Sequence, residues 1–204
     1  MRGAGGSFAS LKSCPSPRTR SAPPAGGVEV RAARESDLAQ IAAIWNHEVL
    51  CTDATTDTEP RDAAAQREWF ARHTERYPVV VATLAPDSAG CAGEVVAYGS
   101  LSPYRPKPAF ARTAEDSVYV ARDRRGIGLG GLILAELIRR GRALDHHSIL
   151  ARITAKNAAS LRLHARHGFR EVGIERESAF KLGRWHDVVI MQRLFTGITG
   201  GTES

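Results

Sequence analysis

The stretch from Glu115 to Gly131, EDSVYVARDRRGIGLGG, constrains the fold of this chain more than any other part of the sequence. Its residues 117–120 are β-branched and aromatic, which predicts a buried strand. A short basic segment and a run of glycines follow, and they lead into the apolar helical pattern LILAELIRRGRAL. Glycines at such a junction let backbone N–H groups converge on a ligand, and the helix behind them adds a positive dipole end. We therefore predict a strand–loop–helix unit that binds a phosphate or pyrophosphate, with Arg124 and Arg125 adding charge.

The spacing within the loop narrows the kind of phosphate ligand. A nucleoside-triphosphate loop is excluded because no Gly-Lys-Ser/Thr is present. The spacing of Gly126, Gly128 and Gly131 matches the G-x-G-x-x-G motif of dinucleotide-binding sites. In such a site the glycines follow their strand directly, and the next strand ends in an acidic residue that binds the ribose. Neither condition is met here. The segment 125–130 is instead R-x-x-G-x-G, and a glycine-rich turn without a ligand is the alternative.

Composition and charge limit the classes of protein to which this chain can belong. With 204 residues, 43% hydrophobic and 25% charged, the chain suits one globular domain. Of its net charge of +6, residues 1–27 carry +4, so the remainder lacks the basic excess that nucleic-acid binding needs. No apolar run is long enough to span a membrane. The three cysteines are scattered, which indicates neither a disulfide framework nor a metal site and favours the cytoplasm.

The order of expected elements predicts the fold class. We expect a disordered tail at 1–27, a domain at 28–195 and a polar tail at 196–204, and an N-terminal transit peptide is an alternative for the first. Strands are expected at 28–32, 78–84, 94–101, 117–120, 147–154, 169–177 and 185–195, and helices at about 38–49, 61–76, 128–144 and 157–167. This order indicates an α/β fold, a mixed sheet with helices on both faces.

The motif at 125–130 resembles the pyrophosphate loop of the GNAT acetyltransferases, and the element order is similar to theirs. From residue 28 to 195 the chain further resembles one branch, the phosphinothricin and methionine-sulfoximine N-acetyltransferases. The matching pieces are Asn46-His47, Thr58-Glu59-Pro60, Arg76-Tyr77-Pro78, Glu115 with 117–120, Asn157-Ala158-Ala159-Ser160, Leu163-His164, Gly168-Phe169 and 183–188. The resemblance implies a GNAT fold with a mostly antiparallel sheet, acetyl-CoA as acetyl donor, no metal, a homodimer, and acetyl transfer to a small amino-acid-like amine.

One difference from the branch concerns the substrate. The branch usually has an aromatic residue shortly before Thr-Glu-Pro, where this chain has Thr56 with Asp57 beside it. An amine of another kind, such as a polyamine, an aminoglycoside or a protein amine, is therefore an alternative substrate. A non-catalytic acyl-CoA-binding sensor is a further alternative.

The resemblance also implies which residues hold the coenzyme. The strand with Val118, Tyr119 and Val120 is expected to splay at a β-bulge and to offer backbone N–H groups to the pantetheine arm, with Tyr119 or Val120 as oxyanion donor. The diphosphate is expected on Arg125, Gly126, Ile127, Gly128, Leu129 and Gly130. Asn157 either binds the pantetheine amide or is an ordinary N-cap. Arg166 either meets the ribose phosphate or is a solvated charge.

Acetyl transfer also needs a base for the ammonium and a proton for the leaving thiolate. Glu115, at the entry to the strand, is the expected base, with Asp116 as the alternative. His164 lies where many GNAT enzymes have a tyrosine that protonates the thiolate. Histidine is usual at this place in the branch, and it suits either an acid or a base role. Substrate contacts are expected from Thr56, Tyr104, Arg105, Arg112 and Glu115, where either arginine could grip a carboxylate. Trp185 is expected to have a packing role, either within the domain or at a dimer interface.

Overall fold

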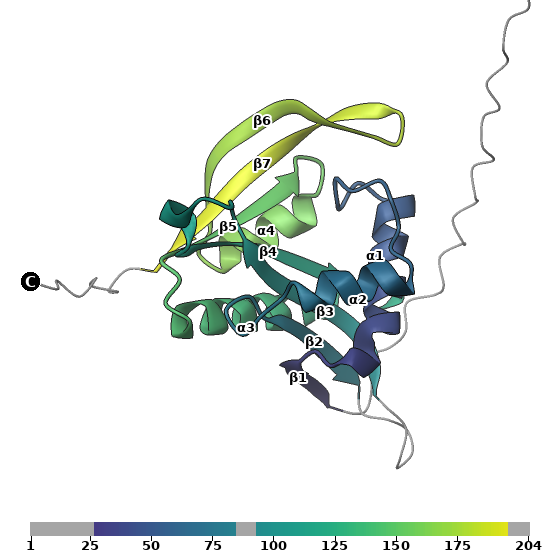
Figure 1. Cartoon of the computed structure of the whole chain (residues 1–204). Coiled ribbons are helices and arrows are strands. Elements are labelled where there is room, and N and C mark those ends of the chain that lie inside the picture. Colours follow the sequence, from purple (N-terminus) through teal and green to yellow (C-terminus); the bar gives the residue numbers. More distant parts are fainter. Residues whose placement is uncertain (1–26, 85–92, 196–204) are drawn as a thin grey trace, which may run out of the picture.

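Seven strands form one mixed sheet in the order β1-β2-β3-β4-β5-β7-β6, as the computed structural model in Figure 1 shows. The strands are β1 Val28–Ala32, β2 Val79–Leu84, β3 Glu94–Pro103, β4 Thr113–Val120, β5 Ser148–Thr154, β6 Arg170–Lys181 and β7 Arg184–Leu194. Only the β4–β5 pair is parallel, and the other pairs are antiparallel. The predicted α/β fold with a mostly antiparallel sheet is confirmed. The structure describes residues 27–84 and 93–195, so the predicted tails and most of the turn after β2 lie outside it.

Helices cover both faces of the sheet. The apolar stripe of α1, Leu38–Cys51, packs with α2, Ala63–Ala71, over one face, and this cluster includes Tyr98 of β3 and Tyr119 of β4. The second face is covered by α3, Leu129–Ala143, and α4, Ala158–Arg166, whose apolar side chains join the larger cluster of the core. Gly141 lets α3 approach closely, because a Cβ there would lie 2.8 Å from Cδ1 of Ile149.

The second helix is shorter than the predicted 61–76, and side chains explain both of its ends. The carboxylate of Asp62 accepts from the N–H of Ala65 at 2.8 Å, so it caps a helix that begins at Ala63. At the other end, Nδ1 of His73 donates to the carbonyl oxygen of Trp69 at 2.8 Å. That carbonyl would accept from the N–H of His73 if the helix continued.

The two central strands diverge after a short pairing. β4 pairs with β5 only from Thr113 to Glu115, although β4 stays in register with β3 as far as Val120. The expected splay of this strand from the next one is confirmed, but the expected bulge is absent from the pairing with β3, because the register between β3 and β4 has no shift. The opening beside β4 comes from the divergence of two parallel strands.

The last two strands form a long hairpin that projects beyond the rest of the sheet in Figure 1. β6 reaches Lys181, four residues beyond its predicted end, and turns through Leu182 and Gly183, which have φ of 51° and 75°. Large apolar side chains are exposed on this hairpin, among them Phe180 and Trp185.

Two further observations bear on the sequence predictions. Cys51, the last residue of α1, is disulfide-bonded, although the scattered cysteines of the sequence indicate no disulfide framework. Among the helices of the described residues, none combines the length and the apolar character needed to cross a bilayer.

Candidate functional site

The opening between β4 and β5 is a cleft of about 440 Å³, called here the larger cleft. Its walls are β4, β5, the glycine loop with the start of α3, and α4. All residues predicted to hold a coenzyme line it except Ile127; they are Val118, Tyr119, Val120, Arg125, Gly126, Gly128, Leu129, Gly130, Asn157 and Arg166. The structure thus brings together residues that lie up to 48 positions apart in the sequence.

The glycine loop presents backbone donors to this cleft. Gly126 and Gly128 have φ of 81° and 92°, a conformation that side-chain-bearing residues rarely adopt. Gly128 is the N-cap of α3, and a Cβ at this position would meet no atom within 4 Å. The first N–H groups of a helix have no acceptor within the helix, so they are available to an anion. The loop therefore fits a diphosphate.

Cationic side chains surround the same cleft. Arg162 and Arg166 line it from α4, and Arg125 lines it from the glycine loop. The guanidinium of Arg125 is hydrogen-bonded to the buried carboxylate of Glu48 on α1, so part of its charge is already compensated. Asn157 caps α4 by accepting from the N–H of Ser160 at 3.1 Å, and it also lines the cleft.

A second hollow, called here the smaller cavity, has a volume of about 220 Å³. It lies on the side of α1 and α2 and is lined by Trp45, Thr55, Thr56, Asp57, Arg61, Trp69, Tyr98, Ser100, Ser102, Glu115 and Thr154, among others. Five residues line both the cavity and the larger cleft: Ala54, Asp116, Ser117, Tyr119 and Arg152. The two hollows therefore meet at β4, so that two ligands can approach each other there.

Glu115 lines the smaller cavity beside this junction. Burial raises the pKa of its carboxyl group, although the charge of Arg152 opposes the shift. A carboxylate with a raised pKa accepts a proton more readily than a solvated one. Glu115 is thus suited to remove a proton from a ligand in the cavity.

Asp116 and His164 form a buried pair at the junction. Nε2 of His164 lies 3.0 Å from Oδ2 of Asp116, and Nδ1 lies 2.8 Å from the carbonyl oxygen of Ser160. Both ring nitrogens face acceptors, so the charged imidazolium satisfies both contacts. Burial opposes this charge, but the hydrogen bond and charge of Asp116 outweigh it and raise the pKa of His164. Oδ1 of Asp116 is buried without a partner among the described residues.

The side chain of Tyr119 packs within an aromatic cluster. Its ring centroid lies 5.2 Å from that of Trp45 and 5.3 Å from that of Tyr98. Burial raises the pKa of the Tyr119 phenol, so the hydroxyl stays protonated at neutral pH. A protonated phenol cannot act as a base but can still donate a hydrogen bond, and Tyr119 lines both hollows.

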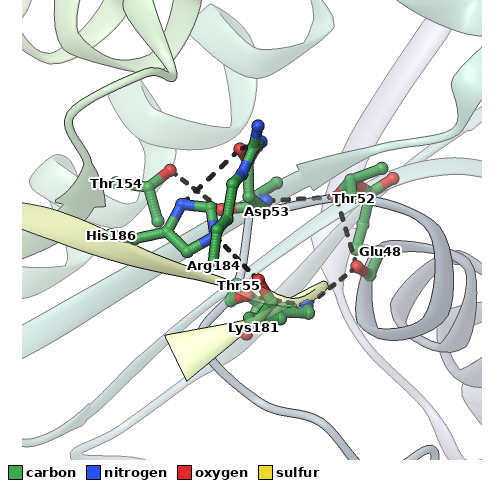
Figure 2. A network of polar contacts seen from close by, with 9 residues as sticks. Glu48, Thr52, Asp53, Thr55, Thr154, Lys181, Arg184 and His186 are labelled. Atoms are coloured by element: carbon green, nitrogen blue, oxygen red, sulfur yellow. Dashed lines mark hydrogen bonds and ion pairs between the residues drawn. The ribbon is translucent and has the colours of Figure 1, made fainter. Parts of the chain in front are cut away.

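The loop that follows α1 lines both hollows. The β6–β7 hairpin holds this loop in place, as Figure 2 shows. Nζ of Lys181 donates to the carbonyl oxygens of Thr55 at 2.8 Å and Glu48 at 3.2 Å. The guanidinium of Arg184 donates to the carboxylate of Asp53 at 2.8 Å, and the hydroxyl of Thr154 donates to the carbonyl oxygen of Asp53 at 2.8 Å. These contacts thus fix the position of residues 54–57, which line the hollows.

Some predicted substrate residues are not brought to the cavity. Arg112 donates to the side chain and the backbone carbonyl of Asp145, at 2.7 and 3.1 Å. The guanidinium of Arg105 stacks 5.0 Å from the ring centroid of Tyr104. None of Tyr104, Arg105 and Arg112 lines either hollow.

Sequence reasoning did not single out several residues of the cavity wall. It missed Trp45, Trp69, Arg61 and Arg152 in this role, and it named Asp116 only as an alternative base. The apolar spacing of α1 and α2 marks Trp45 and Trp69 as core residues, and no spacing links Asp116 to a histidine 48 residues later.

Comparisons with known proteins agree with this geometry. Residues 41–169 match the family model described as the acetyltransferase (GNAT) family. The chain is 42% identical over 168 residues to phosphinothricin N-acetyltransferase of Streptomyces coelicolor, which covers 81% of this chain and 95% of that protein. It is 43% identical to an L-methionine sulfoximine/L-methionine sulfone acetyltransferase of Pseudomonas paraeruginosa, over 80% of this chain and 92% of that protein.

Solved structures give the same result. A GNAT phosphinothricin acetyltransferase of Sinorhizobium meliloti, in complex with AcCoA, matches with a TM-score of 0.75 and 34% identity. The match covers 82% of this chain and 88% of that one.

Proposed function

Because the chain belongs to the GNAT family of acetyltransferases, we propose that it transfers the acetyl group of acetyl-CoA to the amino group of a small amino acid. The substrate class is that of phosphinothricin and methionine sulfoximine or sulfone, since proteins with those names are its relatives. The single observation that carries the proposal is the meeting of the larger cleft and the smaller cavity at β4.

The larger cleft is assigned to acetyl-CoA, which supplies an activated thioester. The N–H groups of the glycine loop and the start of α3 bind its diphosphate, while arginines of α4 attract the remaining phosphate charge. On β4, the edge freed by the divergence from β5 offers backbone groups to the pantetheine arm. The N–H of Val120 polarises the thioester carbonyl as the oxyanion donor. It points away from β3, because the N–H of Ala121 beside it donates to Val96 of β3, whereas the N–H of Tyr119 points toward β3.

Glu115 and the Asp116–His164 pair are assigned to proton transfer. Glu115 accepts a proton from the substrate ammonium, directly or through water, so that a neutral amine attacks the carbonyl carbon. After the attack the nitrogen releases its second surplus proton to Glu115, which has by then passed the first proton to water. As the C–S bond breaks, His164 supplies the proton that the departing sulfur takes up. Asp116 keeps the imidazole charged before this step and can serve as the base in place of Glu115, because it also lines the cavity.

The wall of the cavity bears on the competing substrate classes. Asp57 adds a third carboxylate to Glu115 and Asp116, which favours a cationic amine. Arg61 and Arg152 also line the cavity, and a polyamine would bring its positive charges against both guanidinium groups. An amino acid carries one charge of each sign and avoids this repulsion.

We further propose a homodimer in which the exposed hairpin face packs against its copy. Phe180 and Trp185 are 56% and 58% exposed, and their ring centroids lie 5.2 Å apart. Exposed aromatic side chains that are gathered on one face are typical of protein interfaces. Four properties stay predictions from the sequence. They are a cytoplasmic location, no nucleic-acid partner, no membrane partner and no metal.

The test is release of free CoA from acetyl-CoA with phosphinothricin, methionine sulfoximine and methionine sulfone, compared with spermidine and an aminoglycoside. We expect turnover with the three amino acids at millimolar concentration or below. Turnover restricted to the polycations would replace the substrate class. Binding of acetyl-CoA without turnover of any amine would favour the sensor.

A further inference from the structure

Arg61 lines the smaller cavity, and no carboxylate of residues 27–84 or 93–195 forms an ion pair with it. The other arginine in the wall, Arg152, donates both terminal nitrogens to the carboxylate of Glu175, one of them at 3.2 Å. Among the described residues, by contrast, no carboxylate forms an ion pair with Arg61, and its Nη1 is buried with no hydrogen-bond partner. A buried guanidinium N–H without an acceptor costs stability, so such an atom calls for a ligand.

The surrounding residues hold Arg61 firmly in place. The side-chain amide of Asn46 on α1 binds its backbone on both sides, accepting from the N–H of Arg61 and donating to its carbonyl oxygen, each at 2.8 Å. Its guanidinium carbon lies 4.2 Å from the ring centroid of Trp45 and 4.7 Å from that of Trp69. Two indole rings and a fixed backbone thus preorganise the planar donor group.

The carboxylate of Asp57 does not take up this donor. Asp57 lines the same cavity, but its Oδ2 accepts from the hydroxyl of Thr55 at 3.2 Å, and its own N–H donates to that hydroxyl at 3.2 Å. The Thr55 hydroxyl thus engages Asp57, whose charge acts on Arg61 without a direct ion pair, and the side chain of Arg61 lines the cavity. A planar guanidinium suits a carboxylate or a similar oxoanion, which it can bind through two parallel hydrogen bonds.

We propose that Arg61 is the subsite for an oxoanion of the amine substrate. This assignment rests on the proposed function, because it places an amino acid in the smaller cavity with its ammonium near Glu115 and Asp116. The oxoanion is either the α-carboxylate or an oxygen-bearing acid group at the end of the side chain. Arg61 thereby selects zwitterionic and acidic amines over simple amines of the same length.

Pairs of substrates that differ by one carboxylate test the assignment. Methionine sulfone is compared with 3-(methylsulfonyl)propan-1-amine, and phosphinothricin with (3-aminopropyl)methylphosphinic acid, in wild type and in Arg61→Met. Methionine keeps apolar contact with the two indole rings and removes the charge. Arg72→Met is the matched control, because Arg72 is the C-cap of α2, the helix that begins two residues after Arg61, and its guanidinium is exposed.

The two sources of the oxoanion give different results. If Arg61 binds the α-carboxylate, Arg61→Met lowers kcat/KM for methionine sulfone by about 10- to 100-fold and that for its decarboxylated partner by about threefold or less. If Arg61 binds the side-chain acid, both phosphinic compounds lose activity and both sulfones keep it. Arg61→Lys retains the charge without the planar fork, and it is expected to fall between wild type and Arg61→Met.

Other outcomes overturn the assignment. An equal loss with all four compounds, or wild-type preference for the amines without an acid group, shows that Arg61 only supports the wall. Thermal melting and the Kd for acetyl-CoA identify a folding defect, and Arg61→Lys then carries the comparison. If wild type acetylates none of the four compounds, the proposed function itself is contradicted. If wild type prefers some of the four compounds and Arg61→Met keeps the same preference, only the assignment of Arg61 is contradicted.

Discussion

Nε2 of His164 on α4 lies 3.0 Å from the carboxylate of Asp116 on β4, and both side chains are buried where the larger cleft meets the smaller cavity. Asp116→Asn removes the charge that keeps the imidazole protonated. We expect kcat to fall by about 10- to 100-fold. We also expect the alkaline limb of the kcat profile to move to lower pH, because burial then lowers the pKa of His164 without opposition. A profile with the same limb in wild type and variant would remove the pair from the proton step.

The same pair makes stability depend on pH in a direction that can be worked out. The folded pKa of His164 is raised above the value near 6.5 of an unfolded chain. Its contribution to the free energy of unfolding is therefore fully present below about pH 6.5 and is lost as the pH rises through the folded pKa. Urea titrations of wild type between pH 5 and 9 should show this loss, and Asp116→Asn should flatten it.

Glu115→Gln keeps the size of the side chain and removes the proposed base. We expect kcat/KM to fall by about 10²- to 10⁴-fold while the Kd for acetyl-CoA stays within about twofold of wild type. The acid limb of the kcat/KM profile, set above the ordinary glutamate pKa by burial, should disappear. Glu75→Gln, an exposed change outside both hollows, is the control. A variant with wild-type turnover would transfer the base role to Asp116.

Gly128→Ala and Gly183→Ala form a matched pair of glycine substitutions. Both glycines have positive φ, at 92° and 75°, and at both a Cβ would meet no atom within 4 Å. Each change should cost about 1 kcal/mol of stability through backbone strain. Only Gly128 lines the larger cleft, so only Gly128→Ala should weaken acetyl-CoA binding, by about tenfold in calorimetry. Equal affinities in the two variants would place the coenzyme elsewhere.

Lys181→Met removes the ammonium group that ties the hairpin to the 53–57 loop. Two buried carbonyl oxygens, those of Glu48 and Thr55, then lose a donor, and we expect a loss of about 2 kcal/mol in the free energy of unfolding. We also expect KM for the amine to rise and kcat to fall, because the displaced loop lines the smaller cavity. Lys107→Met, at an exposed lysine, should change neither quantity. Unaltered KM and kcat in Lys181→Met would mean that the loop holds its place without the hairpin.

Trp185→Asp tests the proposed dimer. A carboxylate in the exposed aromatic face of the hairpin should oppose contact between two copies, and light scattering should report the mass of one chain instead of two. Asp123→Asn, a change outside the hairpin, serves as the control. A wild-type chain of monomer mass, or a variant that remains a dimer, would contradict the proposed interface.

The sequence predicts the fold well where a local pattern carries the information. The strand, glycines and helix of 117–144 all appear, because β-branched residues, a left-handed glycine and an apolar helical stripe act over short distances. The same stretch predicts which residues line the larger cleft. The helix expected at 61–76 is too long, because its ends depend on two side-chain caps, Asp62 and His73.

The candidate site is less predictable where it depends on contacts between distant segments. Arg61 acquires its role only when two tryptophans from two helices enclose it, and both of these look like core residues in the sequence. The pairing of Asp116 with His164 is likewise invisible before the sheet and α4 meet. The expected splay of β4 from β5 is present, but it occurs without a register shift between β3 and β4.

The grip of the C-terminal hairpin on the loop after α1 has a consequence for the newly made chain. Thr55 and Lys181 are joined across 126 residues, so the wall between the two hollows is completed only when the final strands leave the ribosome. Ribosomes add about 5–20 residues per second. While the segment between Thr55 and Lys181 is being synthesised, the site therefore lacks the contacts that the hairpin makes. Catalytic competence is thus acquired only after β6 and β7 have been synthesised and have closed on the loop that follows α1.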